Sequence, residues 1–310
     1  MIVTLTPNTA LDYTLVVPRL ALNTTLRASE HTWGMGGKAA DAAWILGKLG
    51  RPVLALGFAA GGNGERMADL LRAHGVTTDF VPVDGETRLN VVLVTADGSG
   101  QTTYTVPGLR VAAEHLAQLE QRYTTALDEA TCVVLGGSLP TGVPADFYAE
   151  AIRQARARGL PVIFDASGPA LRAGLAGRPS LIKPNRDELC ELLGSDALAT
   201  HDIPAAARRL QHEHGCDVVV TLGADGALAV LGERAYHVPV LKVPVASTAG
   251  AGDGVLAGLA LALSQGLPLE DGLRHGTALA GAIVQTLATA DFRVEDYEAL
   301  LPRVELTALP

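Results

Sequence analysis

The chain has 310 residues, of which 48% are hydrophobic, 4% aromatic and 18% charged. These values are typical of a compact protein and argue against disorder, collagen and coiled coil. With 24 Lys and Arg against 33 Asp and Glu, the net charge is −9, which argues against nonspecific binding to nucleic acid. An anionic ligand would therefore be held locally, by a few placed cations and backbone N–H groups.

Short β-branched runs alternate with longer Ala- and Leu-rich segments from about residue 50 onward, which is the pattern of βαβ units around a mainly parallel sheet. The expected strands are residues 53–57, 132–136, 162–165, 181–183 and 218–222. The expected helices are residues 64–73, 112–127, 145–158, 187–193, 204–214, 251–265, 269–287 and 295–301.

Two stretches, about residues 12–33 and 88–106, interrupt this alternation. The second contains two β-rich runs joined by Ala-Asp-Gly-Ser-Gly at residues 96–100, a composition typical of a hairpin turn. We expect both stretches to form one small antiparallel sheet that projects from the edge of the large sheet as a lid. The lid should expose apolar residues such as Val91, Leu93 and Val106 on one face.

The cysteines and the apolar segments indicate in which cellular compartment the protein is expected. Cys132, Cys190 and Cys216 are odd in number and have no C-x-x-C spacing, so they suggest neither a disulfide framework nor a zinc site. Residues 1–7 lack the basic start of a signal peptide, and the apolar run 255–263 is shorter than the roughly 20 residues that a membrane span needs. We therefore expect a cytoplasmic protein without a membrane segment.

Residues 247–255 read Ser-Thr-Ala-Gly-Ala-Gly-Asp-Gly-Val and lead directly into an apolar helix. Gly250, Ala251 and Gly252 leave backbone N–H groups uncovered at a helix N-terminus, where the helix dipole favours a phosphate. Asp253 in the first turn could take a proton from a hydroxyl while those N–H groups receive the phosphoryl group. Alternatively, Asp253 only stabilises the helix and the glycines only allow close packing.

A second glycine-rich segment, Gly-Gly-Lys-Ala-Ala-Asp at residues 36–41, also leads into a helix. The backbone of Gly36 and Gly37 could wrap a small polar ligand, with Lys38 meeting an anionic substituent and Asp41 reaching hydroxyls. A plain glycine turn with a solvated lysine is the alternative. The segment is not a Walker A motif, because alanine follows the lysine where Ser or Thr is needed.

Lys183, Asn185 and Glu188 lie at the end of an expected strand and the start of the next helix. Asn185 and Glu188 share a face, so their oxygens could orient a hydrated Mg²⁺ ion. The same pair is close to a capping box, and both interpretations can hold together.

Two further strand ends carry polar or glycine residues. Thr221, Gly223 and Gly226 follow an apolar strand and could border a nucleotide, although a hairpin turn accounts for them equally well. Ser138 could contact substrate, but Pro140 replaces the last glycine of a G-x-S-x-G elbow, which weakens a serine-hydrolase interpretation. The eight histidines show no metal-ligand spacing and are expected to be structural or solvent-facing.

In their order along the chain, these segments resemble the motifs of the PfkB family of carbohydrate kinases, and the resemblance covers nearly the whole chain. The matching segments are Asn8–Asp12 (family pattern N-P-A-x-D), Gly36–Lys38 (G-G-K-G), Ser138–Pro140 (S-L-P), Lys183–Asn185 with Glu188 (K-P-N-x-x-E), and Thr248 with Gly250–Asp253 (T-x-G-A-G-D). Three positions depart from the patterns: Thr9 replaces proline, Ala39 replaces glycine, and Asp41 replaces a sugar-contacting asparagine. An added carboxylate would repel a phosphosugar unless a cation compensates or Asp41 only accepts from hydroxyls.

The resemblance implies a ribokinase-like three-layer α/β/α sandwich in which residues 1–310 form a single kinase domain with the lid described above. It implies that ATP and Mg²⁺ are used, that Asp253 is the base, that Gly250, Ala251 and Gly252 form the anion hole, and that Asp12 binds a sugar hydroxyl. Asn185 and Glu188 would order Mg²⁺ through water, and the nucleotide would be bordered by Lys183, Thr221, Gly223, Gly226 and Thr248.

The expected lid strands contain Arg27 and Arg88. Together with the N-terminal and Gly-Gly-Lys motifs, arginines at these positions resemble the branch of the family that phosphorylates hexoses already carrying a phosphate. Arg27, Arg88 and Lys38 would then converge on the phosphate of the substrate, although an arginine on an exposed β face can be merely solvated. Fructose 1-phosphate is the first expectation, with tagatose 6-phosphate and fructose 6-phosphate as alternatives. The resemblance also implies a homodimer through the lid. The rival interpretations are a non-catalytic sugar-phosphate sensor and a hydrolase that uses Ser138.

Overall fold

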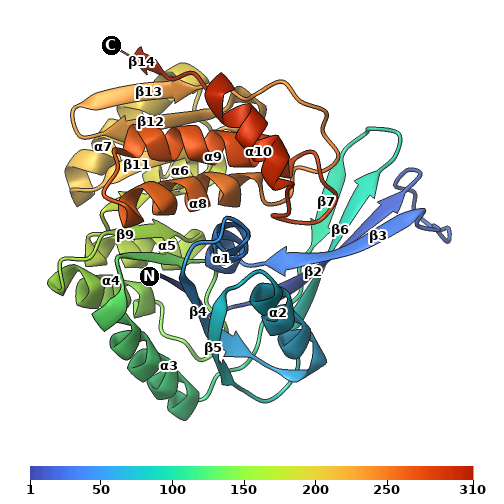
Figure 1. Ribbon diagram of the computed structural model, residues 1–310, viewed down its shortest axis with the longest axis horizontal. Coiled ribbons are helices and arrows are strands. Elements are labelled where there is room, and N and C mark those ends of the chain that lie inside the picture. Colours follow the sequence, from blue (N-terminus) through green and yellow to red (C-terminus); the bar gives the residue numbers. More distant parts are fainter. Residues whose placement is uncertain (310) are drawn as a thin grey trace.

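A large twisted sheet forms the middle of the molecule in the computed structural model, which describes residues 1–309 (Figure 1). Its ten strands run in the order β14-β13-β12-β11-β10-β9-β8-β1-β4-β5. The parallel strands are β1 (Ile2–Thr6), β4 (Val53–Ala59), β5 (Thr77–Pro82), β8 (Cys132–Gly136), β9 (Val162–Asp165), β10 (Leu181–Ile182) and β11 (Asp217–Thr221). The antiparallel edge consists of β12 (Ala227–Leu231), β13 (Arg234–Val238) and β14 (Thr307–Leu309).

Helices cover both faces of this sheet. One layer contains α1 (Lys38–Lys48), α2 (Gly61–Ala73), α8 (Ala251–Ser264), α9 (Leu269–Ile283) and α10 (Val294–Leu300). The other contains α3 (Ala113–Ala126), α4 (Phe147–Ala157), α5 (Gly168–Gly174), α6 (Arg186–Leu193) and α7 (Ile203–His214). Successive strand residues enter opposite cores, as Ile163 and Phe164 of β9 do. The expected three-layer α/β/α sandwich is confirmed.

A small second sheet, in the order β3-β2-β6-β7, projects from the side of the large one (Figure 1). Its strands are β2 (Ala10–Val17), β3 (Glu30–Gly36), β6 (Arg88–Thr95) and β7 (Gln101–Tyr104). The expected hairpin is present between β6 and β7, but the expectation of a wholly antiparallel sheet is wrong, because β2 and β6 pair in parallel. β2 follows β1 and β6 follows β5, and both leave the large sheet in the same direction.

The lid strands alternate between covered and partly exposed residues. Val92 and Val94 of β6 are buried, whereas Val91 and Leu93 are half-buried and Val106 is 46% exposed. The alternation agrees with the expected apolar lid face, although two of its three named residues are only partly accessible.

Close contacts between small residues fix α8 against α9. A Cβ atom at Gly258 would lie 2.1 Å from the backbone nitrogen of Gly276, so the two helix backbones touch directly. This contact sets the position of α8 and therefore of its N-terminus. None of the helices within residues 1–309 has the length and apolar character to cross a lipid bilayer.

Candidate active site

The predicted motifs meet at the carboxyl edge of the parallel strands. Asp165 is the last residue of β9, Lys183 directly follows β10, and Thr221 ends β11. In open α/β sheets this edge is where ligands bind. The lid contributes Asp12 from β2, so residues from both sheets contribute to the site.

The N-terminus of α8 has the geometry of an anion site. Gly250, the N-cap residue, has φ +84°, and a Cβ atom there would lie 2.3 Å from the backbone nitrogen of Ala290. Only glycine fits this conformation without strain. Ala251 N–H makes only a long 3.4 Å bond to the carbonyl of Thr248, and the N–H groups of Gly250 and Gly252 have no backbone acceptor within residues 1–309, so this turn can receive a phosphate.

Asp165 binds two lysines at this edge. Lys38 Nζ lies 2.6 Å from Asp165 Oδ1, and Lys183 Nζ lies 2.7 Å from Asp165 Oδ2. Burial alone would raise the pKa of Asp165, but the two ammonium groups outweigh it and the pKa is lowered. Lys183 is 4% exposed, and its Nζ lies 3.7 Å from where a Cβ of Gly252 would stand, which places its charge beside the N-terminus of α8.

Lys38, which the sequence predicts to meet an anionic substituent, is bound by carboxylates of the protein. Its ammonium also lies 2.8 Å from Glu188 Oε1, so two carboxylates bind it. Burial lowers the pKa of Lys38, but Asp165 and Glu188 outweigh burial and raise it above its ordinary value. The positive charge of Lys38 is therefore compensated by two carboxylates of the protein.

Asp12 is the centre of a second polar cluster, on the lid side. Its two oxygens accept hydrogen bonds from Asn90 Nδ2 at 2.8 Å and from Thr289 Oγ1 at 2.9 Å. Gly36 is required beside it, because a Cβ there would lie 2.2 Å from Asp12 Oδ1. Burial raises the pKa of Asp12 to about 6 against the lowering effect of these bonds and of Arg88.

The two arginines differ in their placement. Arg88 is half-buried and donates hydrogen bonds to the carbonyls of Asn8 (3.1 Å) and Thr9 (3.4 Å), with Asp12 near enough to affect its pKa. Arg27 is exposed and lies in the loop between β2 and β3, so its expected place in a lid strand is wrong. Alternation of buried and exposed residues identifies strands, but it does not show where a strand ends, so the sequence pattern could not place Arg27 in the loop.

Asp253 lies in the first turn of α8, with part of its surface accessible. Burial raises its pKa to about 7; Lys183 and Lys38 act to lower it, and Asp165 and Asp12 act to raise it. Asp41 of α1 is within hydrogen-bonding reach of Asp253. The structure thus brings the expected base together with Lys38, Lys183 and the lid-side carboxyl groups.

Asn185 and Glu188 form the capping box that the sequence allows. Asn185 Oδ1 accepts the N–H of Glu188 at 2.8 Å, and Glu188 Oε2 accepts the N–H of Asn185 at 2.9 Å. The Glu188 oxygens keep further lone pairs, which suits an Mg²⁺ ion held through water rather than by direct ligands. Within residues 1–309, no group of three or more His, Cys, Asp or Glu side chains is spaced to hold a metal.

The remaining predicted residues lie along the same edge. Thr221 forms an isolated β-bridge with Asn185, and Gly223 and Gly226 belong to the turn between β11 and β12, so the hairpin interpretation of that segment is correct. Ser138 accepts a hydrogen bond from Asn8 Nδ2 at 2.8 Å, which is not the partner that a hydrolytic serine needs. Thr248 is exposed beside the anion site.

Sequence reasoning missed four residues that organise the site. Asp165 had a signal, because it ends a predicted strand at the ligand-binding edge. Asn90 is at an inward position of a lid strand, which alternation could have indicated. Thr289 lies in the loop after α9, and Gln101 reaches across 147 residues to accept the N–H of Thr248 at 2.8 Å. Neither of these two belongs to a recognisable motif.

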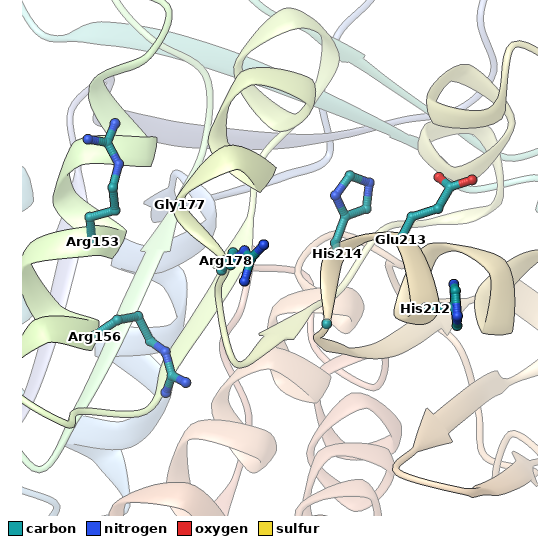
Figure 2. Close-up of a pocket in the computed structure, with 8 residues that line it drawn as sticks. Arg153, Arg156, Gly177, Arg178, His212, Glu213 and His214 are labelled. Atoms are coloured by element: carbon teal, nitrogen blue, oxygen red, sulfur yellow. The ribbon is translucent and has the colours of Figure 1, made fainter.

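A cavity of about 520 Å³ lies away from this edge (Figure 2). Figure 2 shows Arg153 and Arg156 of α4 and Arg178 on one side, with His212 and His214 of α7 on the other. The C-terminal ends of α4 and α7 lie here, and their dipoles disfavour an anion. The cavity contains none of the predicted site residues.

Asp165→Asn is expected to lower the free energy of unfolding by about 3–5 kcal/mol, because it leaves Lys183 buried without a counter-charge. Urea denaturation followed by circular dichroism measures this. Asp69→Asn is the matched control, since Asp69 pairs with Arg72 on the exposed surface of α2 and should change stability by less than about 1 kcal/mol. Equal effects of the two substitutions would contradict the role of Asp165.

Comparisons with known proteins agree with this geometry. The sequence model of the pfkB family carbohydrate kinases matches residues 8–295. The chain is 34% identical to a 1-phosphofructokinase of Bacillus subtilis and 35% identical to one of Haloferax volcanii, with 99–100% of each chain covered. A solved structure of phosphofructokinase-2 from Escherichia coli with substrates and products covers 97% of this chain and 98% of its own, at 29% identity and TM-score 0.88. A possible 1-phosphofructokinase from Thermotoga maritima reaches TM-score 0.89 at 26% identity, over 100% of this chain and 99% of its own. The chain belongs to the PfkB family of carbohydrate kinases.

Proposed function

We propose that this chain phosphorylates fructose 1-phosphate with ATP to give fructose 1,6-bisphosphate. The observation that carries the proposal is the position of Asp253 at the N-terminus of α8, between Lys183 and the lid-side residues Asp12 and Arg88. Relatives named 1-phosphofructokinase, 32–35% identical over nearly the full length, support the choice of substrate. Tagatose 6-phosphate and fructose 6-phosphate are the alternatives.

The sugar phosphate binds on the lid side in this proposal. Asp12 accepts a sugar hydroxyl, the backbone at Gly36 and Gly37 lies against the sugar, and Ser138 borders it. Arg88 binds the phosphate, because its Nη1 has no hydrogen-bond partner among residues 1–309 while Nε and Nη2 are anchored to backbone carbonyls. Arg27 reaches the same phosphate from its loop.

ATP binds on the opposite side, at the ends of β10 and β11. Lys183 and Asn185 lie there with Thr221 and the turn glycines Gly223 and Gly226, and Thr248 lies beside the anion site. Asn185 and Glu188 orient Mg²⁺ through its water ligands. When bound, that ion neutralises charge on the phosphates of ATP.

Phosphoryl transfer then depends mainly on two things: the positioning of the two substrates and the stabilisation of negative charge on the transferred group. Asp253 takes the proton of the acceptor hydroxyl, and the hydroxyl oxygen attacks the terminal phosphorus in line with the departing ADP. The N–H groups of Gly250, Ala251 and Gly252 stabilise the negative charge of the transferred group. The Lys183 ammonium, fixed by Asp165, adds a positive charge at the same place.

We infer the organisation of the chain from the same site. Residues 1–310 act as one kinase domain with a lid, because site residues come from both sheets. A homodimer through the lid is supported by the half-buried Val91 and Leu93 and by Tyr104, which pairs with Val91 and is 54% exposed. A tetrameric inhibited form is known for phosphofructokinase-2 of Escherichia coli, which is 30% identical.

Three buried free cysteines suit the reducing cytoplasm.

The substrate is tested by coupled ADP release over fructose, fructose 1-phosphate, fructose 6-phosphate and tagatose 6-phosphate. Fructose 1-phosphate should give the highest kcat/KM, and unphosphorylated fructose should be poor because Arg88 then has no phosphate to bind. Preference for unphosphorylated sugars would overturn the proposal. Binding of hexose phosphate without any turnover of ATP would favour a sensor instead.

Asp253→Asn should lower kcat by about 10²–10⁴-fold while leaving KM for both substrates nearly unchanged, because it removes the base and keeps the shape. Steady-state kinetics measures this split. Asp271→Asn, the same substitution in the first turn of α9, should leave kcat near that of the wild type. Turnover by Asp253→Asn within a few-fold of wild type would show that another group takes the proton.

Arg88→Ala should raise KM for fructose 1-phosphate about ten- to hundredfold, since charged hydrogen bonds contribute about 1.5–3 kcal/mol. KM for ATP should remain unchanged. The poor activity on unphosphorylated fructose should not fall further. Comparing the two sugars therefore shows how much of the effect of Arg88→Ala comes from binding the phosphate group. Arg72→Ala, an exposed arginine on α2, is the control. A parallel rise of KM for ATP would contradict the assignment.

A further inference from the structure

Asp41 is an acidic residue in an unusual place. It lies in the first turn of α1, is 3% exposed, and its Oδ1 has no hydrogen-bond partner among residues 1–309. Burial raises the pKa of Asp41 and outweighs the backbone of Gly37, which acts to lower it. A buried carboxylate with an unpaired oxygen is costly, so such a group favours a proton or a cation.

The groups that face Asp41 come from several elements and are mostly acidic. Asp253 of α8 lies within hydrogen-bonding reach and Asp12 of β2 lies nearby; both raise its pKa, after the larger effect of burial. From β6 comes Arg88, the cation that acts on Asp12 and Asp41 alike. Asp41 therefore has two carboxyl groups, Asp253 and Asp12, and one guanidinium near it.

The two lysines of the site do not remove this imbalance. Lys38 of α1 is bound by Asp165 and Glu188, and Lys183, after β10, is bound by Asp165. Their charges act to lower the pKa of Asp253, whereas the main influences on Asp41 are burial and the two neighbouring carboxyl groups, which raise its pKa. Asp253 is thus the better placed of the two to carry a negative charge, and its position at the N-terminus of α8 favours the same state.

A protonated aspartate presents one donor and one acceptor, as an asparagine amide does. Asparagine is the residue that the family motif described above has at this position, so a proton on Asp41 restores the donor that the substitution removes. Two carboxyl groups in contact also cannot both ionise easily, and they titrate as a pair.

We propose that Asp41 is a positioning residue that holds a proton while Asp253 is ionised, and that it donates this proton as a hydrogen bond to the carboxylate of Asp253. The active enzyme then has one proton in the pair. Adding a second proton neutralises the base, and removing the first places two anions beside an incoming phosphosugar. The inference rests on the proposed function only in taking Asp253 as the base.

The pH dependence of kcat/KM with fructose 1-phosphate tests the pair. Wild type should show a bell, falling on the acid side as Asp253 is protonated and on the alkaline side as Asp41 ionises. Asp41→Asn cannot ionise, so its alkaline limb should disappear, while its acid limb should stay near that of wild type because the amide presents the same donor to Asp253. One pH unit beyond the alkaline pKa of wild type, the variant should be favoured by about tenfold relative to their ratio at the optimum.

Two further variants complete this test. Asp41→Ala removes the donor and should lower kcat/KM at the optimum without producing an alkaline limb. Asp69→Asn, on the exposed face of α2, should keep both limbs of wild type. An unchanged alkaline limb in Asp41→Asn would overturn the inference, whereas a wild type inactive on every hexose phosphate would overturn the proposed function instead.

Infrared spectroscopy gives a readout that needs no turnover. Above the pKa values of Asp12, about 6, and of Asp253, about 7, wild type should retain a carboxylic-acid C=O band that shifts in heavy water. Asp41→Asn should lack this band and Asp253→Asn should keep it. A band that survives in Asp41→Asn and disappears in Asp253→Asn would place the proton on the base and overturn the inference.

Discussion

The buried ion cluster around Asp165 is the interaction on which the rest of the site depends. One carboxylate at the end of β9 binds Lys38 from α1 and Lys183 from the segment after β10. Buried charges are tolerated only when they are paired, so these elements must meet in one register. The cluster holds the ammonium group of Lys183 beside the N-terminus of α8.

Much of the fold and part of the site could be predicted from the sequence, and the failures have physical causes. The Gly-rich run before Asp253 signals its own helix N-terminus, because glycine spacing and the apolar helix are local features. The partners of Lys38 are not local: Asp165 and Glu188 are 127 and 150 residues away. The parallel pairing of β2 with β6 likewise depends on where each strand leaves the large sheet, which no pattern within the strands encodes.

Charge is distributed unevenly within this acidic protein. At the ends of β9 and β10, Asp165 and Glu188 are each paired with lysine, and the pKa of Asp165 is lowered. On the lid side, the carboxyl pKa values are raised, because burial acts with too few cations nearby. The pKa is thus lowered at Asp165 and raised at Asp12 and Asp41. Asp253 lies between the two groups of residues, with a pKa of about 7 that reflects both.

The amide of Gln101 extends from β7 of the lid to the loop that precedes α8, where its Oε1 accepts Ser247 Oγ at 3.2 Å and the N–H of Thr248 at 2.8 Å. A lid that swings outward must release both donors at once. Displacement of the lid and release of the loop before α8 are therefore coupled through this one amide.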